Sequence, residues 1–205
     1  DQACFNSQQY SKSSVDFPPY TMAGLYFRLA GLERITGDLL AAQKHADLAQ
    51  KEDPKMSEVL ILQAGLALSL RNSKKLEKAF DLLNPDRTSE EATQAIVRIL
   101  ALDAAVQNDD QKLSMLWEYF ISKDQPSIFR NSTEAILASR QNDPQKAKQL
   151  LKKSVPVISM ENEKTFVVDQ HFDSIGADLM TFIAAWEVQD WALANESMRQ
   201  SLKIV

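Results

Sequence analysis

Glycine is scarce in this chain of 205 residues. Only five glycines occur, whereas average usage would give roughly fourteen. Tight hairpins between strands and loops that cradle nucleotide phosphates both depend on glycine, because their backbones need positive φ angles or a close approach to the ligand. The composition therefore disfavours β-rich folds and nucleotide-binding sites, and it favours a helical chain.

Cysteine, long apolar runs and positive charge are also in short supply. Cys4 is the single cysteine, which excludes an internal disulfide and a cysteine-rich metal site. No run approaches the roughly 18 uninterrupted apolar residues of a membrane-spanning helix, so no transmembrane segment is predicted. The net charge of -5 disfavours a nucleic-acid partner, because neutralising phosphates requires concentrated Lys and Arg. The small cluster of Lys74, Lys75 and Lys78 is expected to face solvent.

The chain does contain a regularly spaced set of polar turns between long helical runs. Each turn begins with a small or amide residue, mostly ones that tolerate the left-handed conformation at a helix end, and continues with Asp or Ser, which can cap the next helix. The first residues of the pairs are separated by 35, 36, 34 and 47 positions. The pairs are Gly37-Asp38, Asn72-Ser73, Asn108-Asp109, Asn142-Asp143 and Gln189-Asp190.

The first unit around such a turn resembles the tetratricopeptide repeat. That family places a large residue, then Leu and a small residue three and four positions later, an Ala five residues past the turn and a closing Pro. The matching residues are Tyr26, Leu29, Ala30, Ala42 and Pro54. Glu33 and Ala46 depart from the pattern. Ala42, Ala46 and Ala49 are expected where two helices come close together.

The resemblance covers residues 21 to about 154 well and residues 172 to 205 loosely. It implies an all-α, right-handed α-solenoid of about five helix-turn-helix repeats, which we call TPR-like. The alternative is an irregular helical bundle whose hairpins have similar lengths. In this view residues 1–20 are an extended lead or cap, and residues 21–205 form a single TPR-like domain. An irregular insertion at about 155–171 either folds over the groove or is an inert connection.

The sequence offers few residues for catalysis. His45 lies on a predicted helix, where we expect a partly exposed or hydrogen-bonded ring. His171 stands between Asp169 and Asp173, and these three could share a metal only on an extended backbone, on which side chains two apart share a face. No second cluster completes a coordination shell. No catalytic residue, cofactor or metal site is therefore predicted, and the protein is expected not to be an enzyme.

In the tetratricopeptide family the first helices of successive units line a concave groove that binds a partner. The resemblance implies groove residues that combine aromatic rings with arginines, a set suited to an acidic or C-terminal peptide. These candidates are Phe27, Arg28, Arg34, Arg71, Arg98, Phe129 and Arg130. Phe27 and Gly31 occupy the places of the first Lys and Asn of the family's carboxylate clamp, which disfavours chaperone-tail specificity. Alternatively, the two Phe are core residues and the arginines are solvated.

These features predict a non-enzymatic scaffold that binds a protein or peptide partner. The alternative is a sensor or regulatory domain of a larger bacterial-type signalling protein, in which similar helical repeats bind small effectors. The chain starts at Asp1 and ends within a helical run, so we expect it to be part of a longer protein. The uncapped C-terminal helix also predicts self-association through an apolar stripe. A cytoplasmic and a bacterial periplasmic location fit equally.

Overall fold

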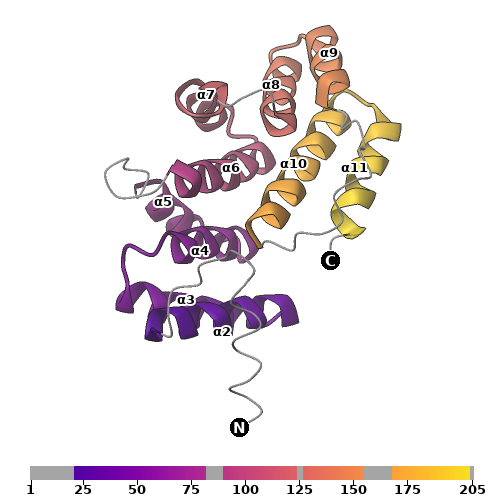
Figure 1. The fold of residues 1–205 in the computed structure, drawn as a ribbon. Coiled ribbons are helices and arrows are strands. Elements are labelled where there is room, and N and C mark those ends of the chain that lie inside the picture. Colours follow the sequence, from indigo (N-terminus) through magenta and orange to yellow (C-terminus); the bar gives the residue numbers. More distant parts are fainter. Residues whose placement is uncertain (1–20, 82–89, 124–126, 155–167, 204–205) are drawn as a thin grey trace.

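The structure is a computed structural model that describes residues 21–81, 90–123, 127–154 and 168–203, and within these ranges it contains α-helices and no strand (Figure 1). The predicted all-α class is thereby confirmed for this part of the chain. None of the described helices is both long and apolar enough to cross a membrane. The predicted lead at 1–20 and the insertion up to residue 167 lie outside the described residues.

Successive helices pair into five hairpins. The first two are α2 (Met22–Thr36) with α3 (Leu39–Glu52), and α4 (Ser57–Ser69) with α5 (Ser73–Asp81). The third is α6 (Glu90–Gln107) with α7 (Asp110–Tyr119), which the short 3-10 helix η2 (Ile121–Lys123) follows. The last two are α8 (Ile128–Arg140) with α9 (Pro144–Ser154), and α10 (Val168–Glu187) with α11 (Trp191–Lys203).

Four of the five hairpin turns have the geometry that the sequence predicts. Gly37, Asn108, Asn142 and Gln189 adopt positive φ angles of 88°, 57°, 64° and 60°. In the third turn the N–H of Asp109 donates to the carbonyl of Ala104 at 2.9 Å, and the Asp109 carboxylate accepts from the N–H of Lys112 at 3.0 Å. The first bond satisfies an orphan carbonyl of α6, and the second caps α7.

The second turn begins one residue earlier than predicted. Arg71, rather than Asn72, takes the left-handed conformation, with φ of 51°. Asn72 is the N-cap instead, because its side-chain oxygen accepts from the N–H of Lys75 at 3.2 Å. Asparagine suits both positions, and here its capping role decides the register, which leaves an arginine in a conformation that costs it energy.

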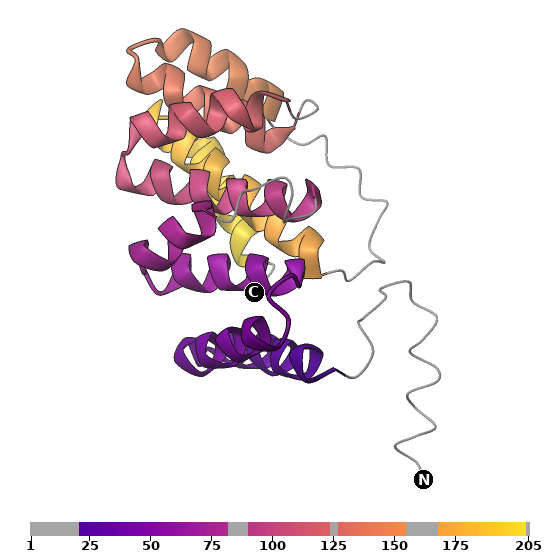
Figure 2. The same ribbon diagram turned by 90° about the vertical axis from the view of Figure 1, so that its left-hand side faces the viewer.

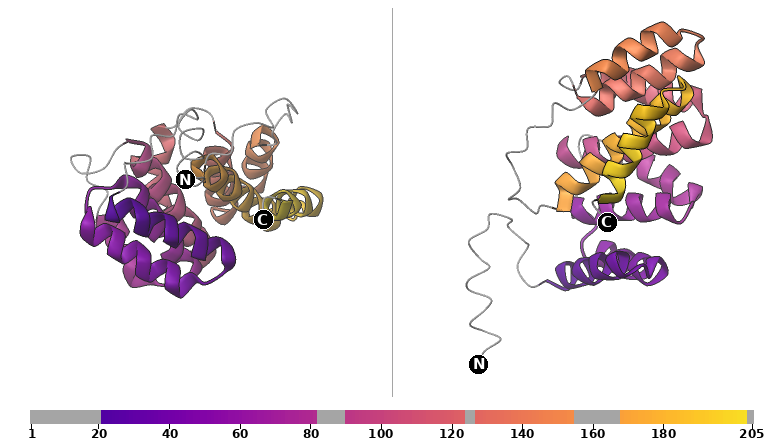
Figure 3. Two further views of the ribbon diagram at one scale, coloured as in Figure 1. Left: turned by 60° about the horizontal axis from the view of Figure 1, so that its bottom comes forward. Right: turned by 90° about the vertical axis from the view of Figure 1, so that its right-hand side faces the viewer.

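The hairpins stack along the chain, with the first hairpin forming one end of the stack (Figure 2). The longest helix, α10, departs from this order because it contacts α6 as well as its neighbours α8 and α9. In the right-hand view of Figure 3, α10 and α11 cross the stack at an angle. Repeats of an open solenoid contact only their neighbours. A TPR-like solenoid therefore stays a prediction, and the contact between α10 and α6 is one that neighbour-only stacking does not include.

The core of the described residues consists of one large cluster and two small clusters at the first hairpin. The large cluster runs from α4 to α11. In the first hairpin, Ala30 of α2 meets Ala42 and Ala46 of α3, and all three are fully buried. Ala49 is also fully buried, in a second small cluster. Small side chains let the two helix backbones approach closely, so the predicted role of these alanines is confirmed.

Arg140, at the end of α8, joins three hairpins. Its guanidinium donates to the Glu187 carboxylate of α10 at 2.6 and 2.9 Å, to Asp110 of α7 at 2.7 Å and to the Ala105 carbonyl of α6 at 2.8 Å. The Arg140 side chain is 12% exposed and that of Glu187 is 19% exposed. Desolvation lowers the pKa of Arg140, but the bonds to Glu187 and Asp110 outweigh it and raise the pKa above its ordinary value.

We expect Arg140→Met to lower the free energy of unfolding by about 2–3 kcal/mol, because it leaves the mostly buried Glu187 carboxylate without its partner. Urea denaturation followed by circular dichroism measures the change. The control is Lys146→Met, which removes the exposed 3.0 Å pair with Glu134 and should change the stability by less than about 0.5 kcal/mol. Equal losses in the two variants would contradict the proposed role of Arg140.

In the second hairpin turn, Arg71→Gly should raise the free energy of unfolding by about 0.5–1 kcal/mol, because glycine adopts a positive φ without a steric penalty. Arg71→Val should lower it, since a branched side chain fits this conformation poorly. Thermal unfolding of the two variants beside the wild type measures both changes, and a glycine variant less stable than the wild type would show that Arg71 does more than form the turn.

Candidate binding surfaces

A cleft opens where α3, α4, α5 and α6 meet. Its volume is about 500 Å³. Helices α3 and α5 belong to successive hairpins and contribute mainly polar side chains, α4 contributes Gln63 beside two apolar residues, and α6 contributes an apolar one. The lining residues are Asp47, Gln50, Leu60, Gln63, Ala64, Lys75, Lys78, Ala79, Asp81 and Ile96. The cleft is therefore a joint feature of the first three hairpins.

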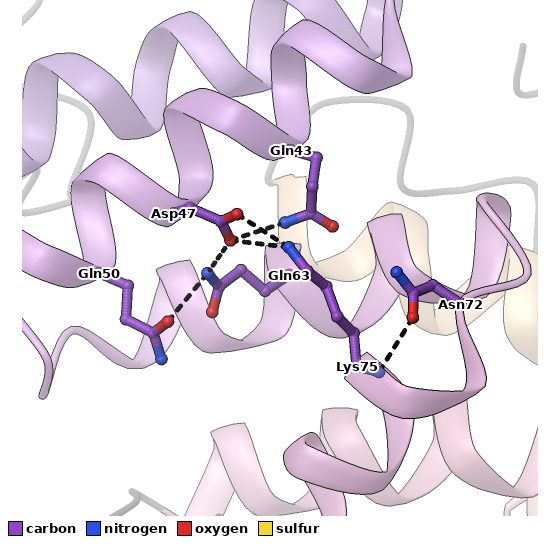
Figure 4. Close-up of polar contacts among 6 residues, drawn as sticks. All are labelled: Gln43, Asp47, Gln50, Gln63, Asn72 and Lys75. Carbon is purple, nitrogen blue, oxygen red and sulfur yellow. Dashed lines mark hydrogen bonds and ion pairs between the residues drawn. The ribbon is translucent and has the colours of Figure 1, made fainter.

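Asp47 is the centre of the hydrogen bonds in this cleft (Figure 4). Its carboxylate accepts from Lys75 Nζ of α5 at 2.8 and 3.0 Å, from Gln63 Nε2 of α4 at 2.9 Å and from Gln43 Nε2 of α3 at 3.0 Å. Gln63 also donates to Gln50 Oε1 at 3.0 Å. These contacts join three helices, and three of the four bonds to Asp47 end on its Oδ1, whereas Oδ2 accepts only from Lys75.

Several polar groups of the cleft remain available to a ligand. Lys78 and Asp81, one turn apart on α5, are both exposed. Gln50 Nε2 and Gln63 Oε1 also line the cleft and are not used in the bonds around Asp47, so they can donate to and accept from a ligand. Gln43 does not line the cleft, and its buried Oε1 has no hydrogen-bond partner among the described residues. The site can therefore exchange hydrogen bonds and pair with charges of both signs.

Two of the groove residues predicted from the sequence do meet. The guanidinium carbon of Arg98 on α6 lies 5.8 Å from the ring centre of Phe129 on α8. Phe129 is 3% exposed, and a Cβ placed on Gly176 of α10 would lie 4.0 Å from its Cε2. Phe129 is therefore a core residue that packs toward α10, as the alternative interpretation of the groove residues held.

The other predicted groove residues are dispersed. Phe27 is half-buried and packs against the small core clusters of the first hairpin, while Arg28 is exposed on α2. Arg34 is half-buried, and desolvation lowers its pKa. Arg71 lies in the turn after α4, and Arg130 lines a separate cleft between α8 and α9. Because Phe129 is buried, it does not line an accessible groove, and a groove formed by the other candidates stays a prediction.

His45 on α3 has a half-buried ring in contact with a carboxylate, which agrees with the expected partly exposed or hydrogen-bonded histidine. His45 Nδ1 lies 2.7 Å from the Glu33 carboxylate, and the ring stacks on Tyr26 with centroids 6.1 Å apart. Residues 169–173 are part of helix α10, so the extended backbone that a metal site there would need is not present. Among the described residues, no group of three or more His, Cys, Asp or Glu is arranged to hold a metal ion.

The cleft was not predicted from the sequence. Lys75 was expected to face solvent with Lys74 and Lys78; its side chain is 33% exposed, but it also reaches across to Asp47, 28 positions earlier. A weak signal exists, since Gln43, Asp47 and Gln50 recur at helical spacing on α3. Only the packing of α3 beside α4 and α5 reveals that these polar side chains meet.

The carboxyl of Asp178 on α10 provides a pH test of how this helix packs. Burial raises the pKa of Asp178 above its ordinary value of 3.8, so the folded state favours the neutral form. At pH 7 the ionised carboxylate therefore costs stability, and Asp178→Asn should be more stable than the wild type. This gain should shrink as the pH falls through the raised pKa of the folded state. It should vanish below the ordinary pKa, where the wild-type carboxyl is neutral in both the folded and the unfolded state.

Thermal unfolding of wild type and Asp178→Asn between pH 7 and pH 4 measures this dependence. Asp143→Asn is the matched control, because Asp143 is an exposed N-cap and asparagine caps equally well. A stability gain that stays constant with pH would show that burial does not act on the Asp178 carboxyl.

Comparisons with known proteins give no match. No protein-family model matches this chain, and neither does any curated protein or solved structure at a significant level.

Proposed function

We propose that this protein is a non-enzymatic interaction module that binds an extended segment of a partner protein in the cleft between α3 and α5. The observation that carries the proposal is the combination of side-chain amides with both charges across two hairpins. An extended peptide brings unpaired backbone N–H and C=O groups. Gln63 Nε2 and Gln50 Oε1 are engaged in the bonds around Asp47, which leaves Gln50 Nε2 as a donor and Gln63 Oε1 as an acceptor for those groups, regardless of the peptide's sequence.

The charges of the cleft indicate which segments it prefers. Asp47 neutralises Lys75 at 2.8 Å, whereas Lys78 is exposed at the same helix face one turn later. A carboxylate on the peptide, from a side chain or from a C-terminus, would therefore be attracted to Lys78. Asp81 disfavours a second carboxylate close to the end of α5. We infer that the preferred segment carries an acidic group near one end.

The cleft is favoured over the concave groove that the family resemblance implies. Phe129, a groove candidate, is buried, and α10 contacts both α6 and α8 on which Arg98 and Phe129 lie. A peptide in that part of a groove would have to displace α10. The first two hairpins keep their polar side chains accessible, and the repeated hairpin turns still support a TPR-like scaffold as the architecture that presents them.

A display library of extended peptides tests the proposal, using wild type and three variants. The cleft variant combines Gln63→Ala with Lys78→Glu, the groove variant is Arg98→Glu, and the control is Lys152→Glu at an exposed position of α9. We expect peptides selected on the wild type to bind the cleft variant at least tenfold more weakly, a loss of about 1.4 kcal/mol. Fluorescence anisotropy measures the affinities.

The groove variant and the control should bind the selected peptides like the wild type. Loss of binding only in Arg98→Glu would favour the concave groove instead. Equal binding to all four proteins would contradict both sites.

A small polar effector is the second candidate, since a volume of about 500 Å³ also suits a small-molecule site. It corresponds to the sensor function that the sequence left open. Native mass spectrometry of the purified protein separates the two candidates. A retained small mass that the cleft variant loses would support the effector.

A further inference from the structure

Helix α2 is apolar on two opposite faces. Its inner face packs Ala23 and Ala30 against the neighbouring helices, where both are buried. Its outer face carries Met22, Leu25 and Leu29, which remain 51%, 42% and 44% exposed. A surface helix usually keeps one apolar stripe for its own core and polar residues on the opposite face. An apolar outer face that no described residue covers is therefore a candidate for contact with another molecule.

The outer residues follow the spacing of a helix that pairs with another helix. Met22, Leu25, Leu29, Leu32 and Thr36 are separated by three, four, three and four positions, which is the a/d pattern of a coiled-coil seam. Leu32 is 61% exposed. We call these five residues the α2 seam. Because the first hairpin forms the end of the stack (Figure 2), the seam has no neighbour among the described helices that could cover it.

We propose that the α2 seam of a second copy of this chain covers it, in an antiparallel, two-fold symmetric pair. The exposed area supports this occupant. The seam is extended by Ile35 and Leu40, which are 84% and 75% exposed. Together these apolar side chains expose roughly 600 Å², the upper end of what a monomer keeps in water. Complete burial of these side chains in both copies would remove roughly 1,200 Å² from water, which is the lower end of the range of specific interfaces.

The seam is also complementary to itself when it is paired antiparallel. A two-fold axis between Leu29 and Leu32 places each of these residues opposite the other one in the second copy. Leu25 then lies opposite Thr36 of the second copy, and Met22 approaches the start of its α3, where Leu40 is exposed. Antiparallel pairing also places the positive N-terminus of each helix dipole beside the negative C-terminus of the other, which is favourable.

No charged residue interrupts the seam, so pairing requires no desolvation of a charge at its centre. Arg28 lies beside the seam, where the aliphatic part of its side chain would cover Ile35 of the second copy. The peptide cleft is lined by α3 to α6, and α2 contributes nothing to it. The pair would therefore present two independent clefts, and its existence does not depend on the proposed function.

Light scattering coupled to size-exclusion chromatography tests the pairing. The seam variant combines Leu29→Glu with Leu32→Glu, and the matched control is Val106→Glu, at a position of α6 that is 60% exposed. We expect wild type and control to have the mass of a dimer, and the seam variant that of a monomer with an unchanged helical circular dichroism spectrum. A monomeric wild type, or a seam variant that stays dimeric, would overturn the proposal.

Cross-linking tests the register without relying on a charged substitution. In a Cys4→Ser background, Leu25→Cys and Thr36→Cys are prepared separately and oxidised alone or mixed. The antiparallel pair predicts a disulfide-linked dimer in the mixture and little in either variant alone. Self-cross-linking of Leu25→Cys would show a parallel pairing and overturn the proposed geometry, and no cross-link in the mixture would overturn it as well.

Discussion

Arg140 and Glu187 hold the second half of the molecule together, although 47 positions separate them in the sequence. The guanidinium of Arg140 also takes the Ala105 carbonyl, one of the last carbonyls of α6, which have no donor within their own helix. Helix α10 is not joined to α9 by a two-residue turn like those within the hairpins. Its position against α6 and α8 therefore depends on these long-range bonds and on buried side chains such as Met180 and Ala184.

The placement of α10 decides where the protein can bind a partner. Because α10 packs against α6 and α8 together, Phe129 is buried and Arg98 beside it is half-buried. The cleft around Asp47 and the seam of α2 lie away from this contact, toward the start of the chain. The last hairpin thus covers part of the face on which a concave groove was predicted, and these two surfaces stay accessible among the described residues.

The first hairpin owes this accessibility to its small side chains. Ala30, Ala42 and Ala46 let α2 and α3 approach closely, but they bury little apolar surface for each residue. This hairpin packs through two small clusters that include residues of α4, rather than through the large core. A partner that covers α2 would add the apolar burial that the hairpin itself lacks, and any ligand that binds only the folded state stabilises it.

The sequence by itself determined the helices, four of the five turns and the alanine contacts within the first hairpin. The helices and turns depend on bonds between residues at most five positions apart, for which residue type is nearly sufficient. The alanines meet across the hairpin instead, and their small size at helical spacing was the signal that located this contact. Even there, Asn72 suited two positions of a turn, and packing chose between them. Only the tertiary structure decided that α10 reaches α6, that Lys75 reaches Asp47, and that Phe129 is buried while the seam of α2 is open. Both faces of α2 show a helical apolar pattern, and periodicity alone does not tell which face its own chain will cover.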